Sequence, residues 1–166
     1  MGDTVALSLG SNKGERELNI KAAVKDLEKK FKTKVIKSSV YETPPLYYAG
    51  PENFLNCCVK FETEFIPREI FDRTSSIEMD IGRVRTVPNA PRVIDIDIIF
   101  IDNKIIVDDD LTVPHPGMHE RRFVLKPLSE IMSGFLHPAM DMTVDELLEN
   151  CSDQSIIKKV KNFWRR

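Results

Sequence analysis

The segment Pro91–Phe100 constrains the fold most, because it has the composition of a strand and yet carries two acids. Its β-branched and aromatic residues are typical of β-strands. Asp95 and Asp97 stand two positions apart, so in a strand their side chains share one face. Ile99 and Ile101 would continue that face as an apolar surface. The pattern therefore predicts a strand that enters a core just beyond two neighbouring carboxylates.

Two carboxylates at the edge of an apolar layer repel each other and resist desolvation. A divalent cation relieves both costs, and Mg²⁺ suits one or two carboxylates completed by substrate phosphates. Asp95 and Asp97 are therefore predicted metal ligands. The alternative is an edge strand whose acids are simply solvated.

The segment Gly82–Arg92 leads directly into the aspartate strand and contains the arginines Arg83, Arg85 and Arg92. It has two prolines and no periodic pattern, which favours a mobile loop with a functional role. The planar guanidinium of arginine matches phosphate oxygens, so the loop is predicted to clamp a polyphosphate. A solvated charge cluster is the alternative.

The overall composition is that of a globular domain, and it excludes several classes of partner. The chain has 166 residues, 24 basic and 26 acidic side chains, and a net charge of −2. We expect one domain, no nucleic acid and no membrane as partner. The odd number of cysteines, with no metal-binding spacing, predicts reduced thiols. Neither a signal peptide nor a long apolar stretch is evident, so a cytoplasmic location is expected.

Elsewhere the chain alternates between strand and helix patterns. Strands are predicted over residues 4–9, 35–42 and 54–64, and helices up to Phe31, over 67–82, through 125–131 and after Thr143. A hairpin turn is expected at Asn103–Lys104, between residues 96–101 and 105–107. The glycines of residues 10–14 fit no phosphate-loop spacing and predict a tight turn. The tail beyond residue 150 is expected to be amphipathic and peripheral.

The strand from Phe54 predicts two chemically different faces. Phe54 and Asn56 share the face opposite the core, where a ring beside a carboxamide would suit a flat heteroaromatic ligand. A half-exposed ring and a solvated amide are the alternative. Cys58 lies on the same face and is expected to fill space. The preceding segment Thr43–Leu46 contains two prolines, so it is either a rigid wall or a strand exit. The core face carries Leu55, Cys57, Val59 and Phe61.

These features together favour phosphoryl-type transfer. That chemistry requires a metal to bridge phosphate oxygens, cations to stabilise charge, and correct placement of the acceptor. His115 stands between two prolines and is a further candidate, whereas no nucleophile system of the Ser/His/Asp or Cys/His type is apparent. The residues alone predict a Mg²⁺-dependent transferase acting on a nucleoside triphosphate.

From about Ala6 to Pro138 the chain resembles the 6-hydroxymethyl-7,8-dihydropterin pyrophosphokinases of the folate pathway. The motifs that carry the resemblance are Leu9–Asn12, Ser39–Leu46, Phe54–Asn56, Gly82–Arg85, Pro91–Arg92 with Asp95 and Asp97, and Leu111–His115. The resemblance implies an α+β, ferredoxin-like sandwich with a mainly antiparallel sheet and helices packed on its faces. It also implies transfer of pyrophosphate from ATP to the pterin hydroxymethyl group, with release of AMP. From its length, the chain is expected to form a single pyrophosphokinase domain over residues 1–166.

The resemblance further implies a role for each matching residue. Asp95 and Asp97 would bind two Mg²⁺ ions, and with Arg83 and Arg92 they would form the catalytic set. The residues implied to bind ATP are Phe71, Glu78, Arg83, Arg85, Arg92, Ile98, Thr112, His115 and Arg121. Those implied to bind the pterin are Thr43, Pro44, Leu46, Phe54, Asn56 and Phe123. A monomer or weak homodimer is expected. The alternatives are another Mg²⁺-dependent phospho- or nucleotidyltransferase and a non-catalytic ferredoxin-like ligand-binding module.

Overall fold

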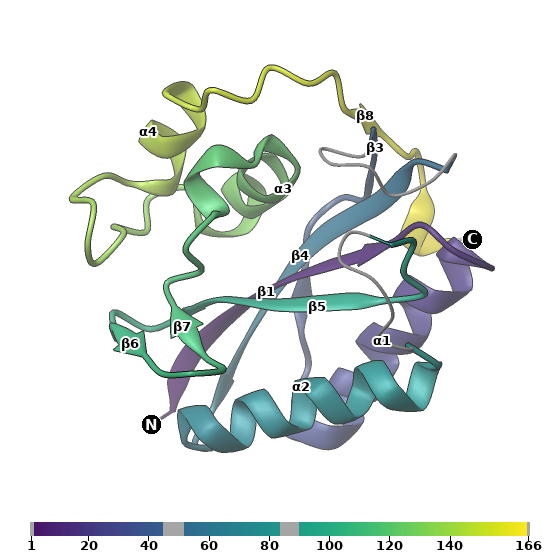
Figure 1. Cartoon of the computed structure of the whole chain (residues 1–166), viewed down its shortest axis with the longest axis horizontal. Helices are drawn as coiled ribbons and strands as arrows, with labels where there is room; N and C mark the ends of the chain where they lie inside the picture. Colours follow the sequence, from purple (N-terminus) through teal and green to yellow (C-terminus); the bar gives the residue numbers. More distant parts are fainter. Residues whose placement is uncertain (1, 45–51, 84–89, 166) are drawn as a thin grey trace.

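A central antiparallel sheet carries the rest of the fold (Figure 1). The structure is a computed structural model and describes residues 2–44, 52–83 and 90–165. The sheet order is β5-β1-β4-β3-β8, and β2 also pairs with β4. The strands are β1 (Asp3–Ser11), β2 (Ile36–Lys37), β3 (Tyr41–Thr43), β4 (Phe54–Thr63), β5 (Asp95–Ile101) and β8 (Lys158–Lys159).

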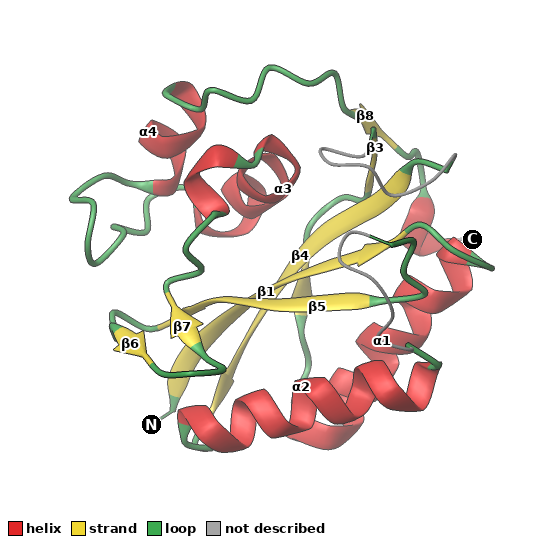
Figure 2. Ribbon diagram, in the orientation of Figure 1, coloured by secondary structure: helices red, strands yellow, loops and turns green. Residues whose placement is uncertain are grey.

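Helices cover both faces of this sheet (Figure 2). On one face lie α1 (Arg16–Phe31) and α2 (Pro67–Ile81), and on the other lie α3 (Arg122–Met132) and α4 (Val144–Glu149). The order β1-α1-β3-β4-α2-β5, with β1 and β4 central, is the split β-α-β arrangement of ferredoxin-like folds. The expected α+β sandwich is confirmed. None of the described helices is long and apolar enough to cross a bilayer.

Alternation along the strands divides the core into two layers. Leu7 and Leu9 of β1 pack with α1 and α2, whereas Ala6 packs with α3 and α4. The odd-numbered face of β4 was expected to be its core face, and it is fully buried on the α1–α2 side. Burial of each large apolar side chain contributes about 1.5–3 kcal/mol. On the opposite face of β4, Cys58 packs with α3 and α4, whereas Phe54 and Asn56 at the start of the strand line a cavity.

A β-bulge in β5 changes which residues share the aspartate face. Ala6 pairs with Phe100 but Leu7 pairs with Ile98, so one extra residue stands on β5. Ile99 lies in the α3–α4 core as expected, but Ile101 lies in the α1–α2 core. The expectation for Ile101 was wrong, because a bulge shifts alternation by one residue.

Two other predicted strand arrangements were also wrong. Residues 35–42 do not form one strand, because the chain breaks between β2 and β3, where Ser38 bonds the Cys58 backbone through both its amide and its hydroxyl, each at 2.9 Å. The turn after Ile101 exists, with Lys104 N donating to its carbonyl at 3.0 Å. However, β6 (Ile106–Val107) pairs with β7 (Thr112–Val113) and not with β5.

Three further predictions concern segments nearer the chain ends, and two of them were wrong. Strand β1 continues through Gly10 to Ser11, so the turn comes later, at Gly14 with φ 73°. The C-terminal tail is not peripheral, because β8 joins the sheet beside β3 and Phe163 of the 3₁₀ helix η2 (Phe163–Arg165) is buried. Thr143 caps α4 as predicted, accepting from the Glu146 amide at 3.2 Å.

Candidate active site

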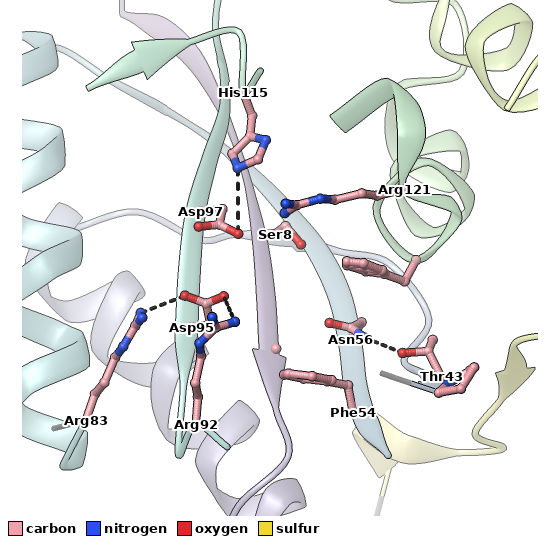
Figure 3. Close-up of a pocket in the computed structure, with 13 residues that line it drawn as sticks. Ser8, Thr43, Phe54, Asn56, Arg83, Arg92, Asp95, Asp97, His115 and Arg121 are labelled. Atoms are coloured by element: carbon pink, nitrogen blue, oxygen red, sulfur yellow. Dashed lines mark hydrogen bonds and ion pairs between the residues drawn. The ribbon is translucent and has the colours of Figure 1, made fainter. Parts of the chain in front are cut away.

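The two aspartates project side by side from the start of β5 into a recess below α3 (Figure 3). Their shared face is confirmed, since both line the same cavity. The cross-strand partners on β1 are small: Gly10 stands opposite Asp95 and Ser8 opposite Asp97. The small side chains leave open space in front of both carboxylates.

Arg83 reaches Asp95 because α2 ends immediately before it. Gly82 takes a left-handed conformation, φ 115°, which ends the helix. The guanidinium of Arg83 lies 2.6 Å from Asp95 Oδ1 and 2.7 Å from Glu78 Oε2. Glu78 also accepts from the Ile96 amide at 2.7 Å. Burial raises the pKa of Glu78, while the Ile96 amide and Arg83 oppose that rise.

Arg92 contacts the other carboxylate oxygen of Asp95. Its backbone is held at the end of β1, since Asn12 Oδ1 accepts from Arg92 N at 2.7 Å and Asn12 N donates to Arg92 O at 3.0 Å. The Arg92 guanidinium is 3.3 Å from Asp95 Oδ2. The negative charge of Asp95 is therefore compensated by two arginines, which stand near the two ends of the segment Gly82–Arg92.

Among the described residues, Asp97 has no ion pair as close as those of Asp95. Burial raises its pKa to about 7, the negative charge of Asp95 adds to the rise, and Arg121 and Arg92 oppose it. About a third of the side chain, 33%, stays accessible within the recess. An ionised Asp97 beside Asp95 is thus costly in the ligand-free protein, and a cation would relieve that cost.

His115 stands above Asp97 as a neutral imidazole. Burial and, to a lesser extent, the nearby charge of Arg121 lower the pKa of His115 to about 4, with Asp95 opposing them. Because Gly117 N donates to His115 Nδ1 at 3.1 Å, the ring hydrogen is on Nε2. Nε2 faces Asp97 Oδ2 at 4.0 Å, and the His115 amide is anchored on the Ile99 carbonyl at 3.1 Å. His115 can therefore donate a hydrogen bond into the recess without carrying charge.

Two cavities meet at the aspartates. The first, of about 290 Å³, lies between β4 and α3, and the second, of about 350 Å³, lies between α2 and the segment from Asp109 to Pro116. The residues common to both linings are Arg83, Asp95, Asp97 and His115. A ligand in either cavity would therefore face the same charged groups.

The far end of the first cavity is aromatic and amide-like. Phe54 and Phe123 line it from β4 and from the start of α3. Asn56 is 4% exposed, and its Nδ2 donates to Thr43 Oγ1 at 2.6 Å. A Cβ atom at Gly10 would lie 2.7 Å from Asn56 Oδ1, so the glycine keeps this end open. Two rings and a buried amide suit a flat ligand that carries donors and acceptors on its edge.

The comparison with known families agrees with this geometry. Residues 6–133 match the model of the 7,8-dihydro-6-hydroxymethylpterin-pyrophosphokinase (HPPK) family. The chain belongs to this family. Its family membership, which the sequence motifs implied, is thereby confirmed.

Individual relatives of this HPPK-family chain extend the comparison. It is 42% identical over 132 residues to the 2-amino-4-hydroxy-6-hydroxymethyldihydropteridine pyrophosphokinase of Bacillus subtilis, covering 79% of each chain. It is 44% identical to the folic acid synthesis protein FOL1 of Dictyostelium discoideum, over 88% of this chain but only 22% of FOL1. Wild-type HPPK-DHPS of Plasmodium falciparum with SDX-DHP shares the fold, with TM-score 0.72 and 16% identity over 90% of this chain and 44% of that one.

The structure gathers the described candidate residues of this HPPK-family chain into the two cavities. Of the predicted pterin ligands, the first cavity contains Thr43, Pro44, Phe54, Asn56 and Phe123, and it also contains Arg92 and Arg121. Of the predicted ATP ligands, the second cavity contains Phe71, Glu78, Arg83, Ile98, Thr112 and His115. Leu46 and Arg85 lie outside the described residues. The binding roles of all these residues stay predictions.

Sequence reasoning missed several lining residues. Ser8 and Gly10 are two small residues of β1, and their spacing of two residues could have placed both on the aspartate side. Asp109 and Asp110 are exposed, yet they border the second cavity, where Asp110 pairs with Arg68 at 2.8 Å. The other missed residues of this cavity are Thr74, Ser75, Ile96, Leu111 and Pro116.

The donor set fits a hard divalent cation that binds together with a phosphate. Within the described residues, no group of three or more His, Cys, Asp or Glu side chains could hold a metal ion. Asp95 and Asp97 supply carboxylate oxygens in one recess, and the like charge and burial of Asp97 favour a cation there. Mg²⁺ is commonly bound by one or two carboxylates with phosphate and water completing its shell. A metal at this position would therefore depend on the nucleotide.

Proposed function

We propose that the chain transfers pyrophosphate from ATP to the hydroxymethyl group of 6-hydroxymethyl-7,8-dihydropterin, yielding AMP and the pterin diphosphate, as a step of folate synthesis. The observation that carries this proposal is the junction of the two cavities at Asp95 and Asp97. One cavity is suited to a flat heteroaromatic ring and the other to a nucleotide. The charged groups between them stand where a triphosphate would meet the acceptor hydroxyl.

The aromatic end of the first cavity would orient the acceptor. The pterin would stack between Phe54 and Phe123, and Asn56 would read its amide-like edge together with the backbone near Thr43. This placement directs the hydroxymethyl group toward the aspartates. Fixing the acceptor in this way converts a bimolecular reaction into an effectively intramolecular one.

The charged groups would stabilise the transferred phosphates. Asp95 and Asp97 would hold two Mg²⁺ ions, which would supply positive charge to neutralise the triphosphate. Arg83 and Arg92 already lie at this point, so each could exchange a bond to Asp95 for one to a phosphate oxygen. Neutral His115 would donate to a nucleotide oxygen from Nε2. The other predicted ATP ligands among the described residues line the second cavity or face the recess.

The proposed reaction is an in-line displacement at the β-phosphorus of ATP. The pterin hydroxyl oxygen forms a new bond to this phosphorus as the bond from it to the α–β bridging oxygen breaks. AMP leaves with the electron pair, and the hydroxyl proton passes to water. Positioning and charge stabilisation suffice for this chemistry, without a protein nucleophile.

The test is an assay that contains the protein, ATP, Mg²⁺ and 6-hydroxymethyl-7,8-dihydropterin, with nucleotide products separated by chromatography. We expect AMP to form in amounts equal to the pterin diphosphate, and formation to stop when EDTA removes the metal. ADP in place of AMP would indicate a simple kinase. ATP binding without any turnover would favour the ligand-binding module.

We further propose that residues 1–166 act as a single domain, as a monomer or weak homodimer, in the cytoplasm. The support is that strands from both chain ends join one sheet, since β1 and β8 belong to the same six-stranded sheet. Light scattering during gel filtration at two protein concentrations would test the oligomeric state. A stable larger assembly at both concentrations would contradict this part of the proposal.

A further inference from the structure

We propose that Glu130 is a positioning residue for the pterin pocket, and that it acts through Tyr41. The inference rests on the proposed function, because it concerns how the same site holds its acceptor. Neither residue lines a described cavity wall of the site, and Tyr41 is only 3% exposed. Any effect of this pair on the ligand must therefore pass through the walls to which the two residues belong.

The pair joins α3 to the segment around β3. Glu130 of α3 uses both carboxylate oxygens: Oε1 accepts from the Ser39 amide at 2.7 Å, and Oε2 accepts from the Tyr41 hydroxyl. Lys159 of β8 lies 3.9 Å from the same Oε2. A second link between α3 and the sheet, from Cys58 Sγ to Val124 O at 3.5 Å, has only a weak thiol donor. The Glu130 carboxylate thus links α3 strongly to the segment around β3.

The Tyr41–Glu130 hydrogen bond joins the two elements that carry the walls of the first cavity. Glu130 follows Phe123 by seven residues, about two helical turns, so both project from one side of α3. Tyr41 precedes Thr43 by two residues, so both share one face of β3. Tyr41 also stands opposite Asn56 of β4 in the strand register. The Tyr41–Glu130 bond therefore sets the distance between the ring wall and the amide wall of the pocket.

The electrostatics make this bond a strong one. Burial tends to raise the pKa of Glu130, but the hydrogen bonds from Tyr41 and Ser39 outweigh burial and lower it. Burial, and then the bond to Glu130, raises the pKa of Tyr41. At neutral pH a phenol therefore donates to an ionised carboxylate, which is a short, charge-assisted hydrogen bond. Such a bond holds the two layers in one arrangement.

Three variants separate the bond from the packing. Tyr41→Phe keeps the ring and removes only the hydroxyl. Glu130→Ala removes both acceptors, whereas Glu130→Gln can still accept from the Ser39 amide and donate to the Tyr41 oxygen. Glu28→Ala is a matched control: this glutamate of α1 accepts from the Val35 amide at 3.1 Å on the opposite face of the sheet. Its side chain is 27% exposed, against 26% for Glu130.

The measurement is calorimetric titration of 6-hydroxymethyl-7,8-dihydropterin into the full chain saturated with Mg²⁺ and α,β-methylene-ATP. We expect Tyr41→Phe to raise the pterin Kd about tenfold, the effect of losing one charge-assisted hydrogen bond. Glu130→Ala should raise it at least as much, and Glu130→Gln should largely restore it. The Kd of the ATP analogue should stay within about twofold in all variants, since neither Tyr41 nor Glu130 lines the second cavity. Glu28→Ala should change neither constant.

The outcomes distinguish the two proposals. Unchanged pterin affinity in Tyr41→Phe, or an equal loss of affinity for both ligands, would overturn the positioning role and leave the proposed function standing. Failure of the wild-type chain to bind the pterin would overturn the proposed function and this inference with it. If Glu130→Ala does not fold, Tyr41→Phe still decides the matter, because it removes a single atom.

Discussion

The two halves of the active site achieve their local order in different ways. In the aromatic half, Asn56 and Thr43 bond each other across β4 and β3, so pairing of these strands also forms the pocket. In the charged half, Asp95 holds two arginines while Asp97 remains costly to ionise. The first half is part of the fold, whereas the second contains a carboxylate whose ionisation is costly in the absence of a cation. This difference predicts opposite responses to substitution.

The largest effect should come from the charged half. Asp97→Ala removes a predicted metal ligand, so we expect turnover to fall by about 10²–10³-fold or more, the range found when one charge-stabilising group is lost. The fold should survive, as far-UV circular dichroism would show, since Asp97 does not contribute a packed apolar side chain. Near-wild-type activity would contradict the metal-binding role of Asp97.

A smaller effect is expected on acceptor binding in the aromatic half. Phe123→Ala should weaken pterin affinity by about 1–3 kcal/mol, the cost of losing a stacking ring in a pocket. Calorimetry with the metal and an ATP analogue present would measure this loss. Nucleotide affinity serves as the internal control, because Phe123 lines the first cavity and not the second. Unchanged pterin affinity would remove Phe123 from the binding site.

The aromatic half should also differ in stability. Asn56→Ala removes a buried amide and leaves the Thr43 hydroxyl without that partner, so the free energy of unfolding should fall by about 1–3 kcal/mol. Urea denaturation of the ligand-free protein would measure the change. If stability were unchanged, the amide would serve only the ligand, and the contrast between the two halves would fail.

The smallest expected effect is a gain in stability, whereas the preceding substitutions cause losses. The pKa of Asp97 is raised to about 7, so the folded state favours the protonated form, and ionisation opposes folding increasingly from about pH 4 to pH 7. Asp97→Asn should therefore raise the melting temperature above pH 7 by about 2–4 °C, a modest rise because part of the side chain meets water. The rise should vanish near pH 4. Thermal unfolding in the presence of EDTA, measured near pH 4 and above pH 7, would test this. An equal rise in melting temperature at both pH values would contradict it.

Much of the site could be predicted because several of its residues lie in the same strand, where the alternation of side chains fixes which of them share a face. The shared face of Asp95 and Asp97 and the two faces of β4 follow from the strand period alone. The same reasoning failed at Ile101, where the bulge against β1 shifts the period. It also failed at Gly10, whose place opposite Asn56 and Asp95 depends on strand pairing.

By itself, the sequence determined the family, the alternating strands and helices, and the residue types that meet in the site. Only the tertiary structure decided which charges pair. Arg83 and Arg92 both bind Asp95, and Tyr41 binds Glu130, 89 positions away in the chain. The physical reason is that side-chain periodicity is a local property, whereas hydrogen bonds and ion pairs depend on packing between distant segments. The sequence of a single strand predicted the aspartate pair, but the side chains that contact the two aspartates come from three other parts of the fold.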